Sequence, residues 1–192
     1  VRGGKGKERG RGRGEGGEGS VALDGGGGEQ RREDRWEFVY TGYANSCAVR
    51  GRRHYLTRNF FGRLAGRMPQ NIVGVIARLQ QQPAAMAFYR RDSNTLYGRY
   101  WGCLAEFDRL HFETCVYQGM DLAIDEGLRR VDAGAEGEHK LGRGFGPQIT
   151  HSWPYLRHPG LREAVADSLL HEREGVRGWG EEARDDVPYR RG

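Results

Sequence analysis

The spacing of apolar residues changes repeatedly along this chain between a helical period and a strand period. Over 34–66, apolar residues recur every three or four positions, which predicts two helices, the second capped by Thr57. Strand-length segments at 71–79, 84–91 and 95–101, joined by short polar turns, predict an antiparallel meander. The helical period returns over 110–128, and a short strand at 129–133 follows.

This order of elements predicts an α/β fold in which a mixed sheet is covered by helices. Because a helix lies between the third and fourth strands, these two strands should run parallel if they are neighbours. Further along, apolar and polar residues alternate over 149–153 and predict another strand, and Pro159 suits the first turn of a last helix. We expect this helix to bury Leu161, Val165, Leu169, Val176 and Trp179.

The first 33 residues differ in composition from the rest of the chain. Gly provides 13 of these 33 residues but only 19 of the following 159. A segment with so few apolar residues cannot offset the entropy of ordering its backbone, which predicts a disordered low-complexity tail over 1–33 and one folded domain over 34–192. The Arg-Gly repeat over 9–14 resembles segments that bind RNA weakly. A linker is the favoured interpretation, because acidic residues nearly balance the basic ones in this tail.

Charge, cysteine content and hydropathy limit the binding partners and the cellular location that we expect for this chain. The net charge of +5 divides into +2 for the tail and +3 for the rest, so neither part is strongly basic by this count. Cys47, Cys103 and Cys115 form no CxxC pair, which favours a reducing, cytoplasmic location, with organelle targeting left open. No apolar run approaches the roughly 20 residues of a membrane-spanning helix, and no metal-binding motif is present. We therefore expect neither a membrane partner nor a bound metal.

Polar residues with useful chemistry gather in four segments, 97–102, 110–113, 134–140 and 143–152, all at strand ends or in connections. Because ligands bind beyond the carboxyl ends of strands in open α/β sheets, we expect one shared cleft. Carboxylate or imidazole groups that could accept a proton from an attacking amine are His111, Glu113, Glu136, Glu138 and His139. Candidate substrate-binding residues are Tyr97, Arg99, Trp101, Gly102, Gly134, Lys140, Arg143 and His151.

The same four segments, in this order, resemble the FemAB-like family of peptidoglycan biosynthesis/recognition proteins, a branch of the GNAT acyltransferase superfamily. The likeness runs from about Trp36 to Tyr189, and the chain looks like the carboxy-terminal half of the longer family members. The resemblance implies a GNAT-like domain in which the strands ending at Trp101 and Ala133 splay apart to admit a substrate. It also implies acyl or aminoacyl transfer to a small-molecule or peptide amine. The donor would be acyl-CoA or aminoacyl-tRNA, no cofactor would be permanently bound, and tRNA would be a partner only through the donor.

A second hypothesis is a non-catalytic recognition module. Glu136 stands where the family usually has Gln, and Trp153 and Pro154 occupy the place of a second His. These departures suggest a cleft that binds a peptide or an anionic metabolite without transforming it. Turnover by the purified protein would distinguish the two hypotheses.

Overall fold

The computed structural model describes residues 19–22, 29–79, 81–104, 109–134, 138–185 and 187–188. The chain forms two compact units, Val1–Gly134 and Ala135–Gly192. This division falls inside the single domain expected over 34–192, whose extent as one folding unit stays a prediction.

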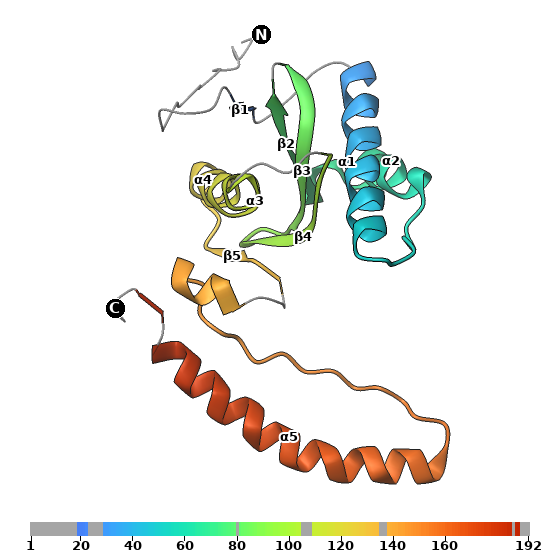
Figure 1. Ribbon diagram of the computed structural model, residues 1–192, viewed down its shortest axis with the longest axis vertical. Coiled ribbons are helices and arrows are strands. Elements are labelled where there is room, and N and C mark those ends of the chain that lie inside the picture. The colour runs from blue at the N-terminus through green and yellow to red at the C-terminus, as the bar shows by residue number, and fades with distance from the viewer. Residues whose placement is uncertain are drawn as a thin grey trace. The chain divides into compact units, whose positions relative to one another are not determined.

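The first unit is built on a five-stranded sheet whose strands lie in chain order (Figure 1). The strands are β1 (Gly19–Ala22), β2 (Ile72–Leu79), β3 (Gln82–Arg91), β4 (Thr95–Cys103) and β5 (Arg130–Asp132). Neighbours from β1 to β4 pair antiparallel, whereas β4 and β5 pair parallel. The predicted meander and the predicted parallel pair are both confirmed, and with them the mixed α/β sheet.

Helices cover both faces of this sheet (Figure 1). On one face lie α1 (Glu29–Val49) and α2 (Arg58–Arg67), followed by a short 3-10 turn, Pro69–Asn71. On the other face, α3 (Leu110–Phe112), a π-helical turn (Glu113–Tyr117) and α4 (Gln118–Asp125) form one continuous helical segment. Each face has its own core: Val39, Tyr43, Phe61, Ile72, Met86 and Phe88 under α1 and α2, and Val75, Ala87, Tyr89 and Leu96 under the other helices.

Part of the segment expected to be disordered has regular structure. β1 pairs with β2, with Val21 opposite Ala77 and Ala22 opposite Ile76, and α1 already begins at Glu29. A strand at a sheet edge is held by backbone hydrogen bonds to its neighbour as well as by side-chain burial. The rest of that segment lies outside the described residues, and the expectation of a disordered tail over 1–33 stays a prediction.

Two glycines allow α1 to approach β4 closely. A Cβ atom added to Gly102 would lie 2.0 Å from the carbonyl oxygen of Gly42, and one added to Gly42 would lie 2.7 Å from the Met86 side chain. One turn further along α1, Asn45 Nδ2 donates a hydrogen bond of 2.6 Å to the carbonyl oxygen of Cys103. The helix is thus pinned to the strand by backbone contact and by one side-chain hydrogen bond.

The π-helical turn changes which side of its helix faces the sheet. A regular helix over 110–128 predicts burial of Phe112, Val116, Met120, Ala123, Ile124 and Leu128. In the structure Ile124 is 75% exposed, whereas Gly119 is buried against the ring of Tyr89. The wider π turn rotates the following residues relative to an α-helix, so the prediction is wrong for Ile124. The Tyr89 hydroxyl donates to the carbonyl oxygen of Thr114 at 2.9 Å, within this turn.

The second unit begins with a 3-10 helix, Glu138–Arg143, continues without regular structure over 145–157 and ends in α5 (Pro159–Asp185). The strand expected over 149–153 is wrong, since the described residues place no neighbouring strand beside it. The helix after Pro159 is confirmed, but Leu161, Val176 and Trp179 are about half exposed rather than buried. In the described residues, no helix combines the length and the apolar character needed to cross a membrane.

Candidate functional site

The parallel pair of β4 and β5 is short, and β4 continues beyond it. The ladder joins Thr95 to Arg130, Leu96 to Val131 and Tyr97 to Asp132, while β4 runs on to Cys103. A Cβ atom added to Gly98 would lie 3.3 Å from the carbonyl oxygen of Asp132, so the chains are still close at that position. Beyond it, the β5 side of β4 has no ladder partner in the described part of the chain. β4 is therefore longer than β5 at this end, and the expected divergence of the two strands stays a prediction.

A β-bulge lies at the start of the part of β4 that has no ladder partner on the β5 side. On β3, Tyr89 pairs with Gly98 and Phe88 pairs with Tyr100, which leaves Arg99 as an extra residue. The Arg99 side chain is exposed, and its guanidinium carbon lies 5.3 Å from the centroid of the Tyr100 ring. Bulges of this kind redirect side chains and are frequent beside active sites. Here the bulge places an arginine where β4 extends past β5.

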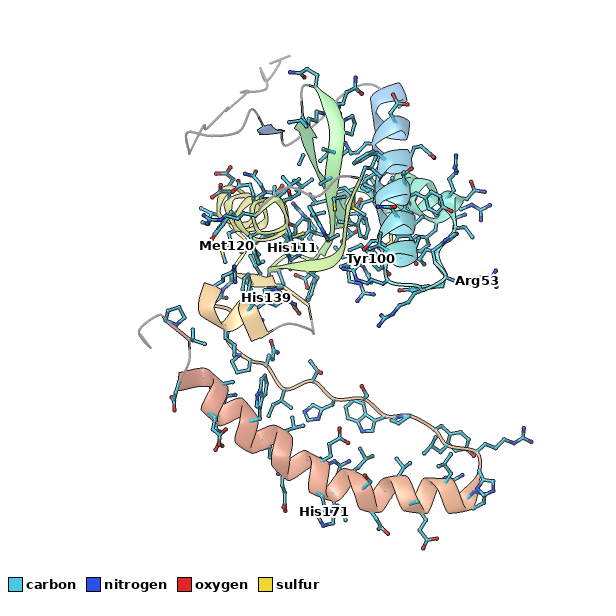
Figure 2. The ribbon with its side chains drawn as sticks, in the orientation of Figure 1. Arg53, Tyr100, His111, Met120, His139 and His171 are labelled. Carbon is cyan, nitrogen blue, oxygen red and sulfur yellow. The ribbon has the colours of Figure 1, made fainter. Side chains whose placement is uncertain are left out.

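Trp101 and His111 come together from two of the predicted segments. Their ring centroids lie 5.2 Å apart in an edge-to-face arrangement, and Phe112 packs at 5.2 Å on the imidazole. Figure 2 shows His111 on the side of the sheet that carries α3 and α4. Nearby in sequence, Glu113 Oε1 accepts a hydrogen bond of 2.9 Å from Gln118 Nε2. Two of the predicted residues are therefore in contact, and a third follows on the same helical segment.

A tyrosine cluster that sequence reasoning missed lies on the opposite side of β4. The Tyr55 and Tyr100 hydroxyls form a hydrogen bond of 2.7 Å, and the Tyr43 hydroxyl accepts from the backbone N–H groups of Tyr55 and Leu56. Burial, reinforced by the hydrogen bond between the Tyr100 and Tyr55 hydroxyls, raises the pKa of Tyr100 to about 12. Burial also raises the pKa of Tyr43. Tyr43 and Tyr100 therefore stay protonated and neutral at physiological pH, and their hydroxyl groups remain available for hydrogen bonding.

Three predicted substrate-binding residues have structural partners of their own. The Tyr97 hydroxyl donates to Asp92 Oδ2 at 2.8 Å. The Gly134 N–H donates to Asp132 Oδ1 at 2.7 Å, and its φ of +84° lies in the region that favours glycine. Gly102 is covered by the Gly42 backbone. These contacts explain why the residues occur there, and a substrate-binding role for them stays a prediction.

The remaining predicted residues belong to the second unit. His139, Lys140 and Arg143 lie on the 3-10 helix, where Arg143 Nη1 donates to the carbonyl oxygen of His139 at 2.6 Å. The ring of His151 lies 5.8 Å from that of Trp153 in the irregular segment. Glu138 starts the 3-10 helix, and Glu136 lies outside the described residues. The convergence of these residues with Arg99 and His111 on one cleft stays a prediction.

The described residues hold no cluster of three or more His, Cys, Asp or Glu side chains that could bind a metal ion. The first unit offers an imidazole beside Trp101, a guanidinium at the bulge of β4, and a carboxylate on the helical segment that carries the imidazole. An imidazole can accept a proton, and a guanidinium can hold an anionic group.

Comparison with known proteins identifies both a family and a fold. The model of the FemAB-like family, described as peptidoglycan biosynthesis/recognition, matches residues 5–191. A possible acetyltransferase from Clostridium difficile 630 has a similar structure, with 11% identity, a TM-score of 0.50, and coverage of 66% of this chain and 95% of that one.

Two further solved structures are similar at lower TM-scores. An acetyltransferase from Trypanosoma brucei is 10% identical, with a TM-score of 0.43 and coverage of 60% of this chain and 94% of its own. Glucosamine-6-phosphate N-acetyltransferase from Arabidopsis thaliana is 13% identical, with a TM-score of 0.45 and coverage of 65% and 92%. No curated protein sequence matches the chain. At these identities the structural likeness concerns the fold alone, which is the GNAT fold.

Proposed function

The chain belongs to the FemAB-like family, and on this premise we propose that it transfers an activated acyl or aminoacyl group onto an amine. The observation that supports this proposal best is the extension of β4 beyond its ladder with β5, with a bulged arginine at its start. Along that edge, backbone groups of β4 are not engaged in a ladder with β5, so a bound substrate can hydrogen-bond with them.

The reaction assigns a separate task to each side chain. The amine nitrogen attacks the carbonyl carbon of the donor, a C–N bond forms, and the bond to the leaving thiol or hydroxyl group breaks. His111 accepts the proton that the amine loses, and Trp101 holds the imidazole by edge contact. Arg99 binds an anionic group of the donor. Proximity of the two bound substrates supplies most of the rate.

We also assign roles in substrate binding and proton transfer to residues of the second unit. Lys140 and Arg143 would bind further anionic groups, and Glu138 and His139 are alternative proton acceptors. The proposed donors are acyl-CoA and aminoacyl-tRNA, and the proposed acceptor is a small-molecule or peptide amine.

A transfer assay with mass-spectrometric detection tests the proposal. The purified chain is supplied with acetyl-CoA or alanyl-tRNA and a panel of amines that includes amino sugars and lysine peptides. His111→Asn should lower kcat at least about 100-fold, as expected for the loss of a general base. Arg99→Gln should raise KM for the donor about tenfold, as expected for one charge-assisted hydrogen bond.

Two matched variants control for unspecific effects. His171→Asn makes the same change at an exposed histidine of α5, and Arg173→Gln does so for an exposed arginine. Both should retain parental kinetics. If His111→Asn turns over as fast as the parent, the assignment of His111 is wrong. Saturable binding of an acceptor without any product would replace transfer by the recognition module.

A further inference from the structure

Positive charge is concentrated in one part of the chain, although the net charge of the whole is small. Residues 38–91 contain nine arginines and no lysine, aspartate or glutamate, which gives this stretch a charge of +9. The whole chain has a net charge of +5, so everything outside 38–91 sums to −4. Dividing the charge only between tail and domain concealed this polarity. The basic stretch covers most of α1, all of α2, and the strands β2 and β3.

Six of these arginines stand exposed without an ion pair to any carboxylate that the structure describes, and Arg50 and Arg90 are two of them. The other four are Arg52 and Arg53, in the connection after α1, and Arg63 and Arg67 on α2. Figure 2 shows Arg53 at the outer side of that connection, away from the sheet. Other arginines of the stretch do have carboxylate partners, since Arg58 binds Glu37 at 2.8 Å and Arg91 binds Glu126. The six exposed arginines without such a partner can therefore bind external anions.

The α2 arginines border an apolar hollow of about 320 Å³. Phe60, Leu64 and Met68 line this hollow together with Arg63 and Arg67. The side chains of Phe60 and Met68 remain 37% and 39% exposed, although both could have been buried in a core. Exposed apolar side chains beside arginines are typical of a surface that binds the interfacial region of a lipid bilayer.

We propose that this α2 face, made of Phe60, Arg63, Arg67 and Met68, docks on the surface of an anionic lipid bilayer. The arginines bind lipid phosphate and carboxylate groups, and Phe60 and Met68 enter the interfacial region. RNA would also supply phosphates, but it offers no apolar partner for Met68. Moreover, the Phe60 ring already packs edge-to-face with Phe61, with centroids 5.3 Å apart. The expectation of no membrane partner rests on the lack of a membrane-spanning segment, which surface docking does not need, and this proposal departs from that expectation.

Vesicle co-sedimentation of the full chain tests the proposal. Vesicles of 70% phosphatidylcholine and 30% phosphatidylserine are compared with pure phosphatidylcholine vesicles at about 0.1 M salt, where surface charge is still felt within roughly 10 Å. We expect binding only to the anionic vesicles and a weaker signal as salt rises. Arg63→Gln combined with Arg67→Gln should lower the partition coefficient about 25-fold, from roughly fivefold per arginine. Phe60→Ser combined with Met68→Ser should also lower it.

The matched control carries the same loss of charge at the same helical spacing. Arg173→Gln with Arg177→Gln removes two exposed arginines from α5 and should leave the partition coefficient within twofold of the parent. Far-UV circular dichroism confirms that each variant is folded. Equal losses in the two arginine pairs, or no preference of the parent for anionic vesicles, would overturn the proposal. So would tighter binding to a single-stranded RNA oligonucleotide that the Phe60 and Met68 changes leave unaltered.

Discussion

The contact between Gly42 and Gly102 makes a quantitative prediction for Gly102→Ala. The new Cβ atom would lie 2.0 Å from the Gly42 carbonyl oxygen, whereas ordinary contact begins near 3.4 Å, so α1 must withdraw from β4 by about 1.4 Å. The hydrogen bond from Asn45 to Cys103, now 2.6 Å long, would then exceed hydrogen-bonding distance. Overpacking costs about 1–3 kcal/mol and the lost hydrogen bond about 1 kcal/mol, which predicts a destabilisation of about 2–4 kcal/mol.

Urea unfolding followed by circular dichroism measures this effect. With a slope of about 2 kcal/mol/M, the midpoint should fall by about 1–2 M. The control is Gly62→Ala on α2, where no atom lies within 4 Å of the added Cβ. There the same substitution should stabilise the protein by about 0.5–1 kcal/mol, because alanine favours a helix. A Gly102→Ala midpoint equal to that of the parent would refute the view that backbone contact holds α1 on β4.

Two further predictions concern single hydrogen-bonding groups. Tyr89→Phe leaves the carbonyl oxygen of Thr114 without its donor and should cost about 1–2 kcal/mol in urea unfolding, and a loss below about 0.5 kcal/mol would contradict this reasoning. The Asp92 carboxylate accepts hydrogen bonds from the N–H groups of Asn94 and Thr95 and from the Tyr97 hydroxyl, which lower its pKa. Because the folded-state pKa is depressed, this stabilisation is complete above the unfolded pKa near 4 and disappears as pH falls through the folded value. The Tm advantage of the parent over Asp92→Asn should therefore shrink below about pH 4, and a difference that does not change with pH would disprove the assignment.

The sequence predicts the helices and strands of the first unit well because their buried positions are apolar. These positions recur with the period of the helix or strand that carries them. Val39 and Tyr43 repeat at helical spacing, and both are buried. The strand over 71–79 is almost continuously apolar because both of its faces are covered by helices. The parallel direction of β4 and β5 follows from the helix between them.

The failures come from interactions that leave no period in the sequence. The π turn depends on packing around Tyr89, and the regular period therefore misplaced Ile124. The alternation over 149–153 is real, but a strand also needs a neighbour to pair with.

The sequence selects two residues of the candidate site that are in contact, and the roles of the site residues stay predictions. Trp101 and His111 were selected from separate segments, and the structure brings their rings into contact. The Tyr55 hydroxyl was missed because a tyrosine in a connection carries no periodic signal, although 52–55 holds four chemically useful side chains in a row. Glycine suits both a close approach to a ligand and a close approach between a helix and a strand. The sequence alone favours the first role for Gly102, and the position of α1 reveals the second.

The bulge in β4 implies that one residue of this strand can be removed without changing how β3 and β4 pair. If Arg99 were deleted, Gly98 would be followed directly by Tyr100. Gly98 would still pair with Tyr89, and Tyr100 would still pair with Phe88. The pairing of β3 with β4 does not require this additional residue. Its effect is a local irregularity in β4 and one positively charged side chain. A shortened chain that folds normally would therefore report on the chemistry of this edge with the scaffold intact.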